Sequence, residues 1–371
     1  MDMFMNDMVN QVPRKPCMRD IAKEAGVSLG TVSRVLSGKQ EVAPEFAQRV
    51  ITVAREMGYQ TRLSTRAPSP RTGGIGSIGY LLDSQEHPTV MSDPFQQHFL
   101  TGIEQKAGDL GGHVVFASVH EEAQAGIVPS IITDKVVRSV ILKVTSGTSE
   151  AWIRRIQALV PTVIIMHRFA DHSIPSVMCD NYGGMFSALQ HLVNLGHTRI
   201  GFFSEDDGET TSFHHIERQG AFDLIRRKLG LDIRPGDIQT PSRNVAKGET
   251  FDAVIRKGLK NFLDQGEARP TAIVCAADVY AFGLMKALPA YGISVPTDLS
   301  LVGFMNTQMC EYSTPPLTSV TLSEGEIGRA AVDLLCQSIE NPAVSPRQVV
   351  VGARVVERLS CAECGAERVT A

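Results

Sequence analysis

Hydrophobic residues recur with helical spacing in three short segments between residues 18 and 59. The first segment, MRDIAKEAG, ends at Gly26, a residue that suits the left-handed conformation after a helix. Ser28 is placed to cap the second segment, VSLGTVSRVL, and Pro44 suits the first turn of the third. Two short helices joined by a tight turn and braced by a third predict a helix-turn-helix unit. The side chains expected to face inward are Ile21, Ala22, Ala25, Val32, Val35, Leu36, Val50, Val53, Ala54 and Met57.

From residue 75 onward, short apolar runs alternate with amphipathic segments. Continuous apolar strands separated by helices indicate parallel sheets that are covered on both faces. With about six strands in each half and a break at residues 173–184, we expect two similar doubly wound lobes. The predicted fold is therefore a small all-α head followed by an α/β body. The expected strands span 75–82, 113–119, 139–144, 161–166, 199–204, 271–276 and 299–304.

Charge is distributed unevenly along the 371 residues. The whole chain has a net charge of −4, yet residues 11–71 carry 11 Lys and Arg against 5 Asp and Glu, a local charge of +6. A basic head on an acidic body is typical of a protein whose head binds a polyanion. A solvated surface explains the charge alone equally well, but the helix-turn-helix pattern within this segment favours DNA.

Several classes of protein are disfavoured by the sequence. No apolar run approaches the ~20 residues that span a bilayer. The N-terminus lacks an apolar block after a basic start, which disfavours a secretory signal. The seven cysteines are scattered and odd in number, as expected for reduced intracellular thiols. We therefore expect a cytoplasmic protein with no membrane partner.

The head resembles the DNA-binding domain of the LacI/GalR family of bacterial repressors. The resemblance rests on MRDIAKEAGVSLGTVSRVLSG and VAPEFAQRVITVAREMGY. In the body, segments similar to the effector domain of that family are DNYGG (180–184), HLVNLGHTRIGFFS (191–204), ERQGAF (217–222), VPTDLSLVGF (295–304) and PPLTSV (315–320). The resemblance implies a homodimer, a pseudo-palindromic DNA operator and a small-molecule effector. It also implies a body like the periplasmic sugar-binding proteins, which bind ligands between two lobes.

The resemblance also implies roles for residues of the second helix. Base reading falls at Leu29, Gly30 and Arg34, and phosphate contacts fall at Thr31 and Ser33. Arg34 fits this role chemically, because a guanidinium group can bond guanine O6 and N7 together. Gly30 has no side chain, so we expect weaker reading of one base pair.

The linker departs from the family pattern. In the family this segment forms a hinge helix on operator binding, and a leucine wedges into the minor groove. Pro68 stands at the wedge position here and Pro70 follows it. Proline inside a helix costs about 3 kcal/mol, so we expect an extended linker. Arg62 and Arg66 remain available for phosphate or minor-groove contacts.

The family's effector contacts fall at His167, Arg218, Arg243, Ala277 and Met305. Sugar-binding relatives commonly carry hydrogen-bonding groups at positions where Ala277 and Met305 supply none. Two arginines and a histidine that can carry positive charge remain, and such donors match carboxylates and phosphates. We therefore expect an anionic effector, such as a sugar phosphate, sugar acid or organic acid.

An alternative is that Arg218 pairs with Asp180 or Asp278 and that the cleft is vestigial, so that the body serves only for dimerisation. His214 and His215 are placed in a loop and interpreted as surface residues. Cys361-x-x-Cys364 lies in a polar tail without the further ligands of a zinc site.

We expect no catalytic residues, no metal and no cofactor, and hence no enzyme. The sequence thus predicts a DNA-binding transcriptional regulator that acts as an effector-controlled repressor. Its expected parts are a disordered arm (1–15), a DNA-binding domain (16–60), a linker (61–74), an effector-binding and dimerisation domain (75–360) and a tail (361–371).

Overall fold

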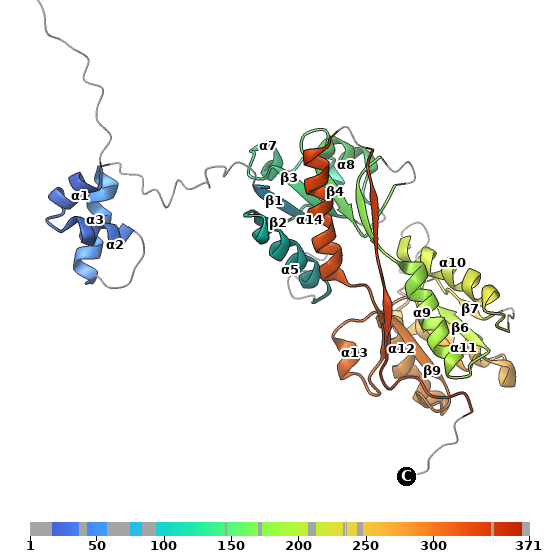
Figure 1. Ribbon diagram of the computed structural model, residues 1–371. Coiled ribbons are helices and arrows are strands. Elements are labelled where there is room, and N and C mark those ends of the chain that lie inside the picture. The colour runs from blue at the N-terminus through green and yellow to red at the C-terminus, as the bar shows by residue number, and fades with distance from the viewer. Residues whose placement is uncertain are drawn as a thin grey trace, which may run out of the picture. The chain divides into compact units, whose positions relative to one another are not determined.

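A computed structural model of the protein contains two compact units, residues 1–73 and 74–371, called here the head and the body (Figure 1). In the ranges described, no helix is both long and apolar enough to cross a membrane. The structure describes residues 17–36, 43–57, 75–83, 94–144, 147–169, 173–206, 213–232, 234, 236–242, 248–342 and 345–365.

The head contains three helices packed around a small core. They are α1 (Met18–Glu24), α2 (Leu29–Leu36) and α3 (Pro44–Glu56). Gly26, just after α1, has a φ of 64°, which glycine adopts at little steric cost. The Ser28 hydroxyl accepts a hydrogen bond from the Thr31 backbone N–H at 3.0 Å and so caps α2. The helix-turn-helix prediction is confirmed, with Ile21, Ala25, Val32, Val50 and Ala54 buried.

The first lobe of the body is built on a parallel six-stranded sheet with the order β11-β5-β4-β3-β1-β2. Alternate residues of its strands face opposite helical layers. Ile141 packs in the cluster that holds Phe99, whereas Leu142 packs in the cluster that holds Trp152. The strands are β1 (Ser77–Leu82), β2 (His113–Ser118), β3 (Ser139–Lys143), β4 (Thr162–Ile165), β5 (Ser176–Cys179) and β11 (Gln348–Val351). The helices are α5 (Pro94–Asp109), α6 (His120–Ala125), α7 (Ser130–Thr133), α8 (Glu150–Gln157) and α14 (Glu324–Glu340).

The second lobe has a six-stranded sheet with the order β12-β10-β9-β8-β6-β7. All its pairs are parallel except β10–β12. The strands are β6 (Ile200–Phe203), β7 (Ile238–Gln239), β8 (Ala272–Cys275), β9 (Ser300–Met305), β10 (Thr318–Thr321) and β12 (Arg354–Val356). The helices are α9 (Asn181–Asn194), α10 (Phe213–Lys228), α11 (Phe251–Leu263), α12 (Asp278–Ala287) and α13 (Met309–Tyr312), with 3-10 turns η3 (Gly266–Ala268) and η4 (Leu288–Tyr291).

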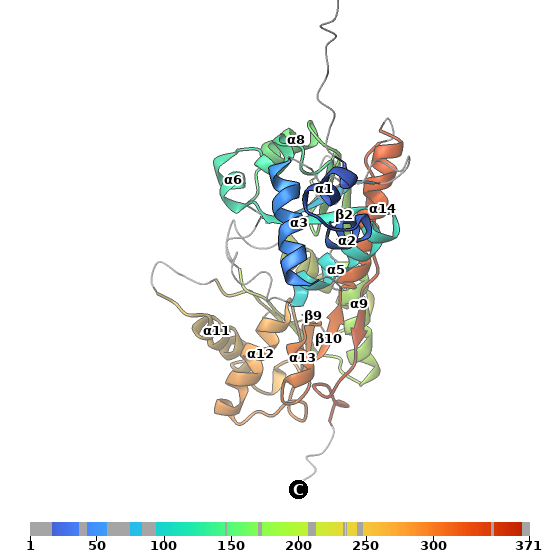
Figure 2. The ribbon, with the colours of Figure 1, turned by 90° about the vertical axis from the view of Figure 1, so that its left-hand side faces the viewer.

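The chain passes between the lobes three times, so the lobes are not consecutive halves of the sequence. After β10, the helix α14 returns to the first lobe and lies beside α5, as Figures 1 and 2 both show. Glycines allow this close approach. A Cβ atom on Gly102 of α5 would lie 2.1 Å from the carbonyl oxygen of Gly325 in α14. Strand β11 then completes the first sheet, and β12 completes the second.

Two expectations need correction. The segment 173–184, expected to be a break, contains β5 before the chain leaves the first lobe at Asp180. The tail expected from residue 361 begins later, because residues 361–365 pack on the second lobe. The Cys361 thiol donates to the Leu301 carbonyl at 3.3 Å, and the Cys364 N–H donates to the Leu195 carbonyl at 2.8 Å.

Candidate nucleic-acid interface and ligand cleft

Helix α2 presents a polar face away from the core of the head. Val32 is buried, whereas Leu29, Ser33 and Arg34 are exposed, Leu29 by 44%. Gly30 is exposed on the same face, one turn before Arg34. This arrangement follows from helical spacing, because the residues at 29, 30, 33 and 34 share the side opposite the core.

Arg34 lies back along α2 toward its N-terminal end. Its Nε donates a hydrogen bond to the Gly30 carbonyl at 3.3 Å. In a helix-turn-helix the N-terminal half of the second helix is the part that reaches base edges, so this position is compatible with the predicted role of Arg34. Thr31 is half-buried, and its hydroxyl lies 2.8 Å from that of Ser28. Arg62 and Arg66, with the rest of the expected linker, lie outside the described residues.

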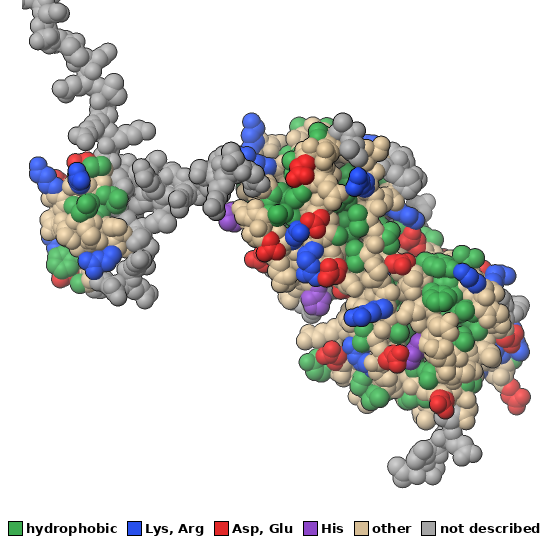
Figure 3. All heavy atoms as spheres, viewed as in Figure 1, with side chains coloured by type: hydrophobic (Ala, Val, Ile, Leu, Met, Phe, Trp, Pro, Cys, Tyr) green, Lys and Arg blue, Asp and Glu red, His purple; other side chains and the backbone are tan. Residues whose placement is uncertain are grey.

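Charge on the surface agrees with this placement. Figure 3 shows Lys and Arg side chains on the visible face of the head. On the visible face of the body, acidic and basic side chains are interspersed. Acidic side chains are also visible on the head, so the excess of basic residues in this unit is a property of the whole segment 11–71 in the sequence.

Arg218 is the most buried charged group of the predicted ligand cleft, with only 2% of the residue exposed. It projects from α10 and donates to the Asn181 side-chain oxygen at 2.9 Å and to the Ala276 carbonyl at 2.6 Å. Its guanidinium group lies over the Phe304 ring, 4.1 Å from the centroid. Burial lowers the pKa of Arg218 from its usual value.

Neither aspartate considered as a partner for Arg218 bonds to it. Asp180 caps α9 by accepting from the Gly183 N–H at 2.8 Å. Asp278 accepts from the Ser319 hydroxyl at 2.5 Å and from both the N–H and the hydroxyl of Thr307. Within the described residues Arg218 forms no ion pair with a carboxylate.

A chain of hydrogen bonds connects Arg218 to the first lobe. Asn181, which accepts from Arg218, donates to His214 Nδ1 at 3.2 Å. His214 Nε2 in turn donates to the Met166 carbonyl, just after β4, at 2.6 Å. Burial and then the charge of Arg218 hold the pKa of His214 well below its usual value. The imidazole is therefore neutral, which fits its use of one nitrogen as donor and the other as acceptor.

An ion pair joins the lobes at the same place. Arg168 of the first lobe donates to the Glu217 carboxylate of α10 at 2.7 Å. The other oxygen of Glu217 accepts from the Asn181 amide, also at 2.7 Å. Asn181, His214 and Glu217 were not predicted from the sequence. The interpretation of His214 and His215 as surface loop residues was wrong, because both lie in the first turn of α10 and are half-buried. His214 points between the lobes, and His215 packs against Tyr280.

The other predicted effector contacts lie around Arg218, except for one. Ala277 follows Ala276, whose carbonyl accepts a hydrogen bond from Arg218. Met305 follows Phe304, whose ring lies beneath the Arg218 guanidinium group. His167 follows Met166 and packs edge-on against Phe169 and Phe213. The expectation of a charged histidine is wrong for His167, because burial lowers its pKa and leaves it neutral near pH 7. Arg243 lies outside the described residues.

Further polar residues stand at the carboxyl ends of strands. Lys143 ends β3, and its charge contributes to lowering the pKa of His214, so it lies near the hydrogen-bonded chain. Asp83 follows β1 and accepts from the Thr148 hydroxyl and from His120 Nδ1 at 2.7 Å. In the second lobe a cavity of about 260 Å³ lies beyond β6 and β7. It is lined by Ser204, Glu205, Asp206, His215, Ile216, Gln219 and Thr240.

Comparisons with known proteins agree with this architecture. Residues 17–62 match the family described as bacterial regulatory proteins, lacI family, and residues 189–361 match the periplasmic binding protein-like domain. The HTH-type transcriptional repressor CytR of Escherichia coli (strain K12) is 29% identical over 350 residues, 92% of this chain and 95% of CytR.

Two solved structures share the fold. The lac repressor dimer bound to operator and the anti-inducer ONPF has a TM-score of 0.63 and 21% identity, covering 94% of this chain and 100% of its own. The complex of the transcriptional regulator CelR with cellobiose has a TM-score of 0.62 and 22% identity, covering 93% and 99%.

A helix-turn-helix head joined to a two-lobed body of the periplasmic binding protein type defines a DNA-binding transcriptional regulator with an effector domain. The chain belongs to the LacI family of bacterial regulatory proteins, a family of transcriptional regulators and not of enzymes.

Proposed function

We propose that the protein is a cytoplasmic repressor that binds a pseudo-palindromic operator as a homodimer and is controlled by an anionic small molecule. Leu29 and Arg34 read bases, with Thr31 and Ser33 at phosphates. Arg62 and Arg66 of the linker contact the DNA backbone or minor groove. The anion binds between the lobes near Arg218, His167, Ala277 and Met305, with Arg243 as a further cationic contact.

The buried charge of Arg218 carries the proposal for the anion. A guanidinium group that is 2% exposed and has no carboxylate partner in the described residues is costly to hold in a protein interior. The carboxylates of Asp278 and Glu217 attract Arg218 without bonding to it. An anion in the cleft would contact the guanidinium group directly, and Lys143 adds positive charge from the first lobe. Because Arg218 connects to both lobes through Asn181 and His214, such a ligand would favour one arrangement of the lobes over another.

The second-lobe cavity narrows the class of ligand. The carboxylates of Glu205 and Asp206 in its lining repel a second anionic group. A ligand with a single anionic group and otherwise uncharged polar groups suits both Arg218 and this lining. A sugar phosphate or sugar acid therefore fits better than a small dicarboxylic acid.

Titration of the operator complex tests this function. The apparent Kd of the protein for labelled operator is measured by fluorescence anisotropy. An anion that acts as the effector should change this Kd by about 5- to 150-fold, the usual range of allosteric coupling. The panel consists of sugar phosphates, sugar acids and organic acids, with the matching neutral sugars as controls. Operator binding that responds to no anion in the panel would instead support the vestigial cleft.

The dimer is proposed to use an exposed apolar surface on α12 and α13. Val279, Met309 and Tyr312 are 51%, 60% and 68% exposed. The Thr307–Asp278 hydrogen bond holds the segment before α13 against the start of α12, so these side chains lie on neighbouring elements. Contiguous exposed apolar residues of this kind mark protein interfaces.

The double substitution Val279→Asp/Met309→Asp is expected to raise the dimer dissociation constant at least ~100-fold. A two-fold interface contains each of the two substitutions twice, and ~0.7 kcal/mol for each of these four copies already gives this factor. Sedimentation velocity measures the shift to monomer. Leu224→Asp, at a residue 57% exposed on α10 of the second lobe, is the matched control and should leave the dimer intact. A dimer that survives the double substitution would place the interface on another surface.

A further inference from the structure

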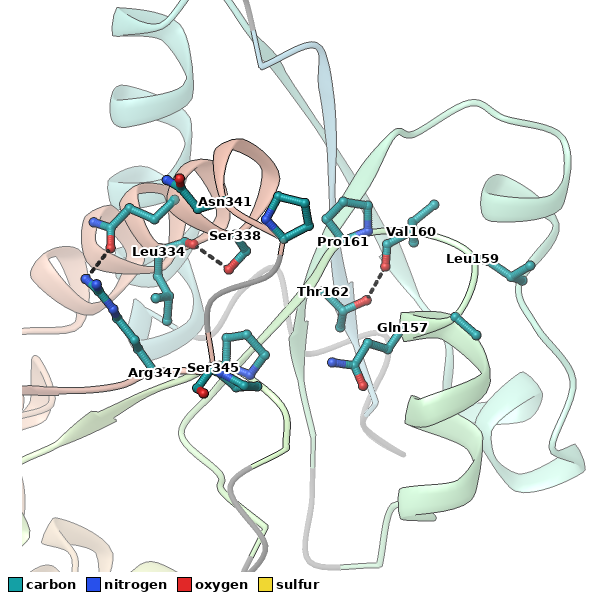
Figure 4. Close-up of a pocket in the computed structure, with 15 residues that line it drawn as sticks. Gln157, Leu159, Val160, Pro161, Thr162, Leu334, Ser338, Asn341, Ser345 and Arg347 are labelled. Carbon is teal, nitrogen blue, oxygen red and sulfur yellow. Dashed lines mark hydrogen bonds between the residues drawn. The ribbon is translucent and has the colours of Figure 1, made fainter.

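A groove of about 680 Å³ opens on the first lobe (Figure 4). Its walls come from the end of α8 with the following turn, the end of α14, and the segment leading to β11. β4 and β5 begin beside it, at Thr162 and Ser176, whereas the cleft residues follow the opposite ends of the same strands. The groove therefore lies at the amino ends of these parallel strands and the cleft lies at their carboxyl ends, so the two are separate sites.

The groove has an enclosed floor and an open rim. Thr162, Pro175 and Leu334 form the floor and are buried. Gln337 and Asn341 stand on the exposed rim. The volume lies within the range of about 300–1,000 Å³ that small-molecule pockets occupy.

The charge of the groove is close to balanced. Of the residues lining it, Arg347 alone is ionised. The C-terminal end of α14 contributes a partial negative charge of about half a unit near the same space. Arg347 is further occupied by a hydrogen bond from Nη1 to the Gln337 side-chain oxygen at 3.3 Å. The groove therefore favours a neutral ligand over an ion of either sign.

Hydrogen-bonding capacity remains on several lining side chains. Within the described residues, no hydrogen bond engages the amide of Asn341 or the hydroxyl of Ser345. The Gln337 amide nitrogen and the Gln157 amide oxygen are also available, since Gln157 uses its nitrogen to donate to Ser173. An amide offers a donor and an acceptor side by side, which matches neighbouring hydroxyl groups on a sugar ring.

Flat apolar faces complete the lining. The lining includes the rigid rings of Pro161, which Figure 4 labels, and of Pro175, Pro342 and Pro346. Such rings pack against the C–H faces of another ring while the amides bind its edge. We propose that this groove binds a neutral carbohydrate of one or two sugar units, as a second small-molecule site that does not depend on the cleft.

Hydrogen exchange of the full-length protein with maltose as the probe tests the site. Peptides covering 157–162 and 334–347 should exchange about threefold more slowly at twice the Kd, because protection grows as 1 + [L]/Kd. The double substitution Gln337→Ala/Asn341→Ala should remove this protection. Gln190→Ala, at a glutamine on α9 of the other lobe, is the matched control and should retain it.

The outcomes separate this site from the cleft. Slower exchange at 157–162 and 334–347, lost in the double variant and kept in the control, supports the groove. Maltose that leaves these peptides unchanged, or that protects only 166–169 and 213–220, overturns it. Protection that persists in the double variant also overturns it. The response of operator binding to anions is read independently, so either proposal can fail while the other stands.

Discussion

Arg34→Ala is expected to weaken operator binding by roughly 5- to 150-fold for each head of the dimer, which corresponds to ~1–3 kcal/mol for each lost bidentate base contact. The physical reason is positional, since Arg34 is exposed on α2 and lies back toward the end of the helix that reaches base edges. Quantitative footprinting on operator variants measures both effects. Affinity should fall, and discrimination at one base pair should relax.

Arg49→Ala provides the matched control for this prediction. Arg49 is an exposed arginine of α3 whose guanidinium group lies 5.3 Å from the centroid of the Phe46 ring. Its loss removes the same charge from the same unit but no base contact. We expect a smaller decrease in affinity that is equal for all DNA sequences. If Arg34→Ala behaves in the same uniform way, Arg34 binds phosphate and does not read a base.

Arg218→Met is expected to lower the affinity for the anionic effector by roughly 10- to 150-fold, since hydrogen bonds to charged groups contribute about 1.5–3 kcal/mol. Methionine fills much of the same space, so the main loss is the charge and its donors. Calorimetry with the anion that changes operator binding measures the effect. Thermal unfolding measured in parallel separates it from a loss of folding.

Two further variants sharpen the test of Arg218. Arg218→Lys keeps the charge but not the planar fork of donors, so affinity should fall less than with methionine. Arg227→Met removes an exposed arginine of the same helix, which pairs with Asp223 at 3.1 Å, and should leave anion binding unchanged. Anion affinity that is equal in wild type and Arg218→Met would contradict the proposed site.

Hydrophobic periodicity predicted most of the fold because the central strands are continuously apolar. All seven expected strands are present, as β1, β2, β3, β4, β6, β8 and β9. The strands that were not predicted carry weaker signals. β7 has only two residues, and β10 is a four-residue strand, TSVT, with a single large apolar residue. β11 and β12 lie at sheet edges and are partly exposed, and β5 was hidden in a segment containing proline and glycine. The pairing of β11 and β12 also depends on chain crossings between the lobes that no local pattern encodes.

The candidate site was predictable only where a motif or strand end marks it. Arg218 was found through the segment ERQGAF. Asn181 and His214 were missed because they meet across 33 positions of sequence through the packing of α9 on α10. Lys143 and Asp83 could have been predicted as site residues, because each is a charged residue at the carboxyl end of a buried strand.

The return of α14 and β11 to the first lobe has a consequence for synthesis on the ribosome. Domains built from one continuous segment can fold as soon as that segment has emerged. The first lobe cannot do so, because its sheet lacks the edge strand β11 until residue 351 has been made. The head has a self-contained core within residues 17–57 and can fold much earlier. A nascent chain therefore carries a finished DNA-binding head long before it has a body to control it.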